Sequence, residues 1–178
     1  MAHSQTHELR EDPHITSIER ITLDELESPV VKQGANYWSA LRGTRRFPSR
    51  KDLHPRDVAS VLPHMVLIKV IDGGDDFEYR IVGEVQAQAY GHRLQGRRVS
   101  QIAAERPAYG HHVRGAYRRI CESGEPIAVR GQIGSDFSYL KYTYCEHIAL
   151  PLSNDDKNVD HILIFSTYVA RAFADGKK

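Results

Sequence analysis

The sequence predicts an α+β domain in which a five-stranded antiparallel sheet carries helices on one face. Three observations lead to this fold class. Two short apolar runs, 65–71 and 77–82, flank the turn DGGDD in the pattern of a β-hairpin. Three further β-type runs lie in the last third of the chain. Helical periodicity precedes the hairpin and also fills the interval between it and the later strands.

The first regular element is predicted to be helical. Thr22 and Glu25 match a capping box, and Pro29 suits the first position of a helix that ends at Gly43. One face of this helix is apolar and comprises Val30, Gly34, Tyr37, Trp38 and Leu41.

Two roles are open for this apolar face. It packs on the domain's own sheet, or it forms an interface with a partner through Val30, Tyr37, Trp38 and Leu41. If it is an interface, Trp38→Asp should weaken self-association without unfolding the sheet.

A second, shorter helix is predicted over 55–62, ending before Pro63. The segment between the two helices is basic, with six Lys or Arg residues from Arg42 to Arg56 against Asp52 alone. It is either a solvated connector or a patch for an anion or a partner.

After the hairpin, the run 84–90 gives one or two helical turns that stop at Gly91. The segment 105–124 is a longer amphipathic helix, with Gly124 as its stop. At 100° per residue His111 points to solvent, and His112 lies at the margin of the apolar face. That face comprises Tyr109, Val113, Ala116, Tyr117, Ile120 and Cys121.

The last three strands are predicted within 126–133, 138–152 and 159–169. The first alternates, and the third is apolar on both faces, as a central strand is. In the second, alternation places Glu146 on an apolar face with Leu140, Tyr142, Tyr144, Ile148 and Leu150. A buried carboxylate needs a partner. Arg80 is one candidate, a bulge that turns Glu146 outward is an alternative, and ligand recognition is a third.

Composition excludes several protein classes. The formal net charge of 178 residues is +1, so no overall field favours nucleic acid or an anionic membrane. We find no signal peptide and no apolar run of membrane-spanning length. Two cysteines without a CxxC motif indicate a soluble, reduced and cytoplasmic protein. No nucleophile motif or metal-ligand spacing is present, so neither a catalytic residue nor a metal site is predicted.

The order of elements and several motifs resemble the PAS domain superfamily. The segment FEYRIVGEVQAQAYGHRLQGRRVSQI is similar to the part of PAS sensors where a strand gives way to short helices, with Gly91, Leu94 and Gly96 at the turns. More narrowly, residues 35–168 resemble a family of short, stand-alone bacterial PAS-like proteins, although the family's D-x-P appears here as DLHP. The matching positions are Tyr37, Trp38, Leu41, Arg42, Pro48, Arg50, Leu62, Pro63, His64, Phe77, Tyr79, Arg80, Val82 and Gly83.

The polar, unpatterned start of the sequence and the resemblance together predict how the chain is organised. Residues 1–20 would be a flexible arm, 21–62 N-terminal helices with the basic connector, 63–170 the PAS-like core and 171–178 a tail. The core would be a five-stranded sheet with a helical insert between its second and third strands.

The resemblance also implies a sensory or adaptor module that is not an enzyme. Such domains hold a small molecule between the sheet and the helical insert. The candidate ligand-binding residues are Tyr79, Arg80, His112, Tyr117, Tyr142, Tyr144 and Glu146. About 20 residues precede the first helix and about nine follow the last strand, so we expect the output to be contact with a signalling partner or homodimerisation.

Haem is not expected as a cofactor, although His112 is the one candidate axial ligand on the long helix. Flavin is not expected because the cysteine motif of flavin photosensors is absent. Two other function classes remain open. One is a small α+β enzyme with Glu146 or a histidine as general base, and the other is a scaffold without a pocket.

Overall fold

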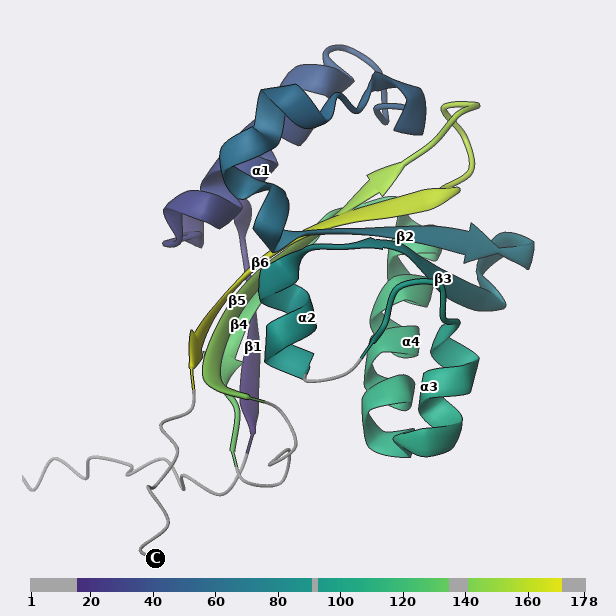
Figure 1. Cartoon of the computed structure of the whole chain (residues 1–178). Coiled ribbons are helices and arrows are strands. Elements are labelled where there is room, and N and C mark those ends of the chain that lie inside the picture. The colour runs from purple at the N-terminus through teal and green to yellow at the C-terminus, as the bar shows by residue number, and fades with distance from the viewer. Residues whose placement is uncertain (1–15, 91–92, 135–140, 171–178) are drawn as a thin grey trace, which may run out of the picture.

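The computed structural model describes residues 16–90, 93–134 and 141–170. Within these residues the centre of the molecule is a six-stranded sheet with the strand order β1-β4-β5-β6-β2-β3 (Figure 1). Each neighbouring pair is antiparallel. The strands are β1 (Ser17–Ile21), β2 (Met65–Ile71), β3 (Asp76–Val82), β4 (Ile127–Gln132), β5 (Tyr142–Leu152) and β6 (His161–Ala170).

Helices cover both faces of this sheet (Figure 1). The α-helices are α1 (Pro29–Arg42), α2 (Glu84–Tyr90), α3 (Val99–Glu105) and α4 (Pro107–Ser123). Short 3-10 helices are η1 (Leu23–Glu25), η2 (Arg50–Asp52), η3 (Pro55–His64) and η4 (Asp72–Gly74). We call the face toward α2, α3 and α4 the inner face, and the face toward α1 the outer face.

Each face has its own apolar core. On the inner face, residues such as Ile68, Phe77 and Ile120 are fully buried. On the outer face, Leu150 and Phe165 pack with Trp38 of α1. The α+β class and the PAS-like order of elements are confirmed. The expectation of helices on one face is wrong, because β5 and β6 carry buried apolar side chains on both sides.

The sixth strand is β1, which the sequence analysis assigned to a flexible arm. Residues 17–20 of that predicted arm instead pair with β4, from Ser17 opposite Gln132 to Ile21 opposite Ala128. The burial pattern of β1 shows why it was missed: only Ile21 is buried, and the rest of this edge strand is polar or half-exposed. Backbone pairing, and not apolar periodicity, holds this strand.

The first helix begins and ends as predicted. Ser28 caps it, Pro29 is its first residue, and Gly43 follows its last. The capping box before it is also present, with the Thr22 backbone N–H donating to Glu25 at 2.7 Å. The short helix η3 is longer than predicted because Pro63 lies within it, before β2 begins at Met65.

The apolar face of α1 packs on the molecule's own sheet. Trp38 is only 5% exposed, and its indole N–H donates to the Pro151 carbonyl oxygen at 2.8 Å. The proposed interface role of Trp38 is therefore wrong, because its side chain is not accessible to a partner. Val30, Tyr37 and Leu41 are half-buried, and a contact through them stays a prediction.

The basic segment is partly engaged within the molecule. Arg45 forms an ion pair with Asp52 at 2.6 Å, and the Arg42 guanidinium lies 5.1 Å from the centre of the Trp38 ring. Arg46 lies over Phe47 and donates to the Ser123 carbonyl oxygen at 3.2 Å. These contacts join the connector to α1 and α4; a partner patch in this segment stays a prediction.

Candidate functional site

A cavity of about 190 Å³ lies between the inner face of the sheet and α4. Helix α4 lines it with residues from successive turns of its apolar face, and β4 and β5 each line it with the residues of one strand face. Thr16 and Ile18, in and beside β1, close its edge. The other lining residues are Gln86, Tyr90, Tyr109, His112, Val113, Ala116, Tyr117, Ile120, Ile127, Val129, Ile133, Tyr142, Cys145, His147, Ala149 and Ile164.

Tyrosine side chains form much of the wall and bond to one another. The hydroxyl oxygen of Tyr79 lies 2.7 Å from that of Tyr109 and 3.5 Å from that of Tyr117. The Tyr142 hydroxyl donates to Tyr90 at 3.4 Å. Burial raises the pKa of Tyr79 to about 12 and raises the pKa of the other four as well. The five phenols are therefore neutral hydrogen-bonding groups over the physiological pH range.

A second polar group in the wall is centred on His147 of β5. The Nδ1 atom of its ring lies 2.7 Å from the Ser166 hydroxyl, and its ring packs edge-on against Tyr168 with centroids 5.2 Å apart. The Tyr168 hydroxyl in turn donates to Oε1 of Gln86 in α2. Desolvation, with a smaller effect of His112, lowers the pKa of His147 to about 4, so its ring is neutral at physiological pH.

The cavity carries no fixed charge. None of the described residues that line it is Asp, Glu, Lys or Arg. Burial raises the pKa of the Cys145 thiol to about 12, so this cysteine is protonated and a poor nucleophile. A mostly apolar wall without Asp, Glu, Lys or Arg side chains favours a neutral molecule.

Three of the seven candidate ligand-binding residues line this cavity: His112, Tyr117 and Tyr142. His112 lies on an exposed part of α4, at the margin of the apolar face as expected, and His111 is exposed. Tyr79 is behind the wall and supports it through its hydroxyl. That any of these residues binds a ligand stays a prediction.

Tyr144 and Glu146 lie on the opposite side of the sheet. The register of β5 against β6 shifts between Tyr142 and Tyr144, so the two tyrosines face opposite sides although they are two residues apart. Beyond this bulge, Cys145 and His147 face the cavity, while Tyr144 and Glu146 face outward. Leu140, which was placed on the same face, lies outside the described residues, as does Gly91.

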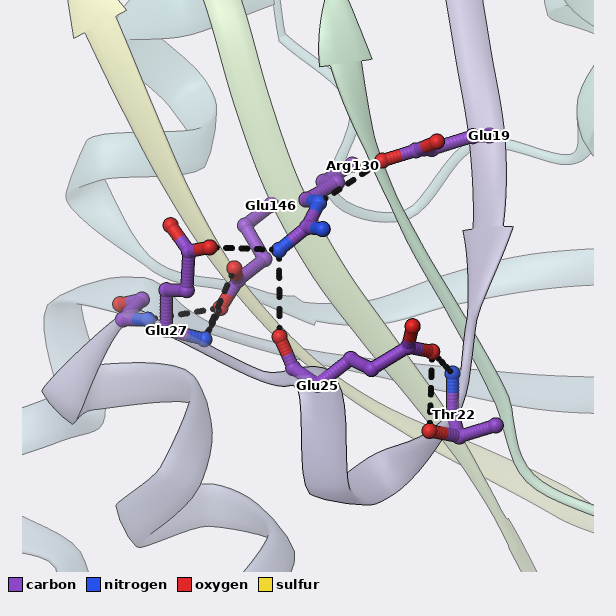
Figure 2. Close-up of polar contacts among 7 residues, drawn as sticks. Glu19, Thr22, Glu25, Glu27, Arg130 and Glu146 are labelled. Atoms are coloured by element: carbon purple, nitrogen blue, oxygen red, sulfur yellow. Dashed lines mark hydrogen bonds and ion pairs between the residues drawn. The ribbon is translucent and has the colours of Figure 1, made fainter.

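Glu146 holds the N-terminal segment and has no contact with Arg80. Its carboxylate is 2% exposed and accepts the backbone N–H groups of Glu27, at 3.1 and 3.3 Å, and Ser28, at 2.9 Å (Figure 2). The predicted Arg80–Glu146 pair is therefore wrong. Arg80 is exposed and pairs with Glu78 at 2.7 Å.

Arg130 makes a second link to the same segment. Opposite Glu146 in the β4–β5 register, it donates to Glu19 and Glu27 at 2.8 Å each and to the Glu25 carbonyl oxygen at 3.2 Å (Figure 2). The N-terminal segment is thus fixed to β4 and β5 on the face opposite to the cavity.

Sequence reasoning missed His147 and Gln86. The alternation of Cys145, His147 and Ala149 is visible in the sequence. Because the bulge is not, alternation counted from the start of the strand assigns these three residues to the wrong face. Gln86 lies in a helix too short to show a periodic apolar face. Its burial, at 6% exposed, follows from tertiary packing.

We expect the stability of the protein to depend on pH through His147. Its pKa is about 4 in the folded chain and about 6.5 unfolded, so between these values only the unfolded chain binds the proton. The free energy of unfolding should therefore fall as pH decreases from about 6.5 to about 4, by about 2–3 kcal/mol. Above about 6.5 this contribution should be constant.

Urea unfolding at a series of pH values, on wild type and His147→Phe, measures this effect. The difference between the two proteins isolates His147, because the other histidines and the carboxylates are common to both. Equal pH slopes in wild type and variant across this window would show that the folded state does not disfavour the protonated ring.

The described residues contain no group of three or more His, Cys, Asp or Glu side chains that could hold a metal ion. No helix within these residues has the length and hydropathy needed to cross a membrane. A smaller hollow of about 50 Å³ lies at the outer face, lined by Tyr37, Arg50, Leu53, His54, Pro55, Val58, Met65, Leu67 and Ile81.

Comparison with known families identifies the fold. A family model described as a PAS domain matches residues 26–164, from the start of the α1 region into β6. Searches of curated proteins and of solved structures return no significant match. The match spans well over half of the chain and contains the cavity-bearing part of the sheet with the helical insert. The chain belongs to the PAS domain family, whose members serve as sensory and signalling modules.

Proposed function

We propose that this protein is a non-enzymatic PAS-type sensor that binds a small molecule in the cavity beneath α4 and signals by contact with a partner protein. The observation that carries the proposal is the cavity itself. It is mostly apolar, has no Asp, Glu, Lys or Arg in its described lining and is large enough for a small organic molecule, and it lies where the sheet meets the helical insert.

Strand β5 supplies a route from the cavity to the surface. Cys145 and His147 face the cavity, and Glu146 between them holds the backbone of Glu27 and Ser28 on the opposite face. A shift of β5 by a bound molecule would act directly on these hydrogen bonds. The N-terminal segment is therefore the surface whose contacts a ligand would change, through a partner protein or a second copy of the chain.

The enzyme alternative loses one of its two candidate bases. Glu146 is on the outer face and its carboxylate is already occupied by backbone N–H groups, so it cannot act on a molecule in the cavity. His147 does reach the cavity, but its low pKa makes it a weak base. A neutral His147 ring suits the binding of a molecule, whereas a general base needs a pKa near the working pH.

A cavity-filling variant tests the proposal. Ala116 of α4 lines the cavity, so Ala116→Phe should occupy the space of a ligand. The control is Arg119→Phe, which adds the same ring at an exposed position of the same helix. With a panel of small neutral aromatic and aliphatic compounds, thermal unfolding of wild type and Arg119→Phe should shift upward, and Ala116→Phe should not respond.

The same samples report the output. Sedimentation velocity should show that a stabilising compound changes the self-association of wild type or its binding to a copurified partner. Equal thermal shifts in Ala116→Phe and wild type would place binding elsewhere and contradict the proposal. No shift with any compound would favour a scaffold without a ligand.

A further inference from the structure

Apart from the exposed His112, the described cavity wall has two polar atoms without a protein partner. The Nε2 atom of His147 and the side-chain NH2 group of Gln86 make no hydrogen bond within the described residues, although the opposite ends of both groups are bonded. Neither atom is fully enclosed by protein, and both side chains line the cavity. A buried polar group without a partner is costly unless something in the cavity satisfies it.

These two groups lie on either side of the same tyrosine. Tyr168 contacts the His147 ring edge-on and donates to Oε1 of Gln86. Because Oε1 is the acceptor in that bond, the amide nitrogen of Gln86 is the end left for the cavity, and it is a donor. The Nε2 atom of His147 is a donor or an acceptor according to which ring nitrogen carries the proton.

The tyrosine hydroxyls are not equivalent to these groups. Tyr109 and Tyr117 bond to Tyr79, and Tyr142 bonds to Tyr90, so the phenols satisfy one another. Besides aliphatic and aromatic side chains, the remaining wall contains Thr16, whose hydroxyl accepts from the Gly134 N–H at 3.1 Å, the buried Cys145 thiol and the exposed His112. The polar requirement of the cavity is therefore concentrated at one place, beside Gln86 and His147.

We propose that the ligand is an uncharged molecule of about one ring in size, with an apolar body and a single hydroxyl group held between Gln86 and His147. This inference rests on the proposed function and names the ligand class for the same cavity. A hydroxyl oxygen accepts from the Gln86 amide, and its hydrogen or second lone pair suits either tautomer of His147. A carboxylate or an ammonium would find no Asp, Glu, Lys or Arg in the described lining to pair with.

The volume of the cavity limits the size of the ligand. A dry apolar cavity of about 150 Å³ in another protein binds benzene. A cavity of about 190 Å³ therefore accommodates a single ring with one or two small substituents.

Three probes with the same apolar body test this class: p-cresol, toluene and p-toluate. Calorimetric titration of the full chain near neutral pH should give the tightest binding for p-cresol. Toluene should bind about tenfold more weakly, because it leaves both polar groups unpaired. The p-toluate anion should bind at least about a hundredfold more weakly than p-cresol, because it brings an unpaired charge into the cavity.

Gln86→Leu and His147→Phe supply the residue-level test. Each variant keeps the size of the side chain and removes one polar partner, so p-cresol affinity should fall about five- to tenfold while toluene affinity stays within about twofold. Two variants are used because either could also perturb Tyr168 or Ser166, and the retained toluene affinity shows that the cavity is intact.

The outcomes separate this inference from the proposed function. Equal affinities for p-cresol and toluene, or a preference for p-cresol that survives in both variants, would overturn the ligand class but leave the binding cavity. Preferential binding of p-toluate would do the same. If none of the three binds wild type, or if all bind Ala116→Phe equally well, both the ligand class and the cavity function are wrong.

Discussion

Replacing Trp38 with Asp should unfold most of the protein or lower its stability by more than about 4 kcal/mol. Trp38 is 5% exposed within the outer-face core, and its indole N–H bonds to Pro151 of β5. Truncation of a buried Trp alone costs about 3–5 kcal/mol, and a carboxylate in its place adds a desolvation cost. Many domains have a total stability of only about 5–15 kcal/mol. Denaturant unfolding followed by circular dichroism measures the change.

Two further variants identify the cause of this loss of stability. Trp38→Phe keeps an aromatic ring and loses the hydrogen bond, so it should cost only about 1–2 kcal/mol. Leu23→Asp introduces the same carboxylate at an exposed apolar residue of the N-terminal region and should change stability by less than about 0.5 kcal/mol. A Trp38→Asp protein that is as stable as wild type but self-associates less would restore the interface hypothesis.

Glu146→Ala should destabilise the protein by about 2–4 kcal/mol. The carboxylate accepts two backbone N–H groups, from Glu27 and Ser28, on a face that water reaches poorly. Its removal leaves both donors unsatisfied and frees the segment that joins β1 to α1. Urea unfolding gives the stability, and hydrogen exchange at these two amides gives the local effect.

Glu146→Gln is the matched control. It keeps one acceptor oxygen in place and removes the charge, so it should cost about 1–2 kcal/mol and leave part of the protection of the two amides. Because Glu146 does not line the cavity, p-cresol should still bind both variants. Loss of binding with unchanged stability would mean that Glu146 contacts the ligand after all.

The parts of the fold that were predictable are those set by local signals. The hairpin of β2 and β3, the cap of α1 at Ser28 and Pro29, and the stop of α4 at Gly124 each have a short-range cause. The alternation of β4 also predicted correctly that Ile127 and Val129 share a face, which is the face that lines the cavity.

The errors arose where tertiary contacts determine whether a strand forms and which way its side chains face. Edge strand β1 has one buried residue, so its sequence gives no periodic signal and its existence depends on pairing with β4. The bulge between Tyr142 and Tyr144 reverses the parity of β5, and nothing in the local sequence marks it. Strict alternation, which takes no account of this shift, predicts that Tyr144 and Glu146 face the cavity and that His147 does not. In the structure His147 faces the cavity, and Tyr144 and Glu146 lie on the other side of the sheet.

The partner of Glu146 was unpredictable for a related reason. A buried carboxylate among apolar residues was expected to need a cation, and Arg80 was the candidate. Its partners are instead backbone N–H groups at the start of α1, more than a hundred residues away in the chain. Backbone donors have no sequence signature, so only the tertiary structure reveals them.

The most direct test of the account is an NMR titration of the isotope-labelled chain with p-cresol, with amide and histidine ring signals assigned. We expect the largest shift changes at cavity residues, including Tyr117, Gln86 and the His147 ring, with smaller changes at the amides of Glu27 and Ser28, which donate to Glu146. Changes confined to the smaller hollow around Tyr37 and His54, or no saturable change at all, would contradict a ligand-sensing cavity beneath α4.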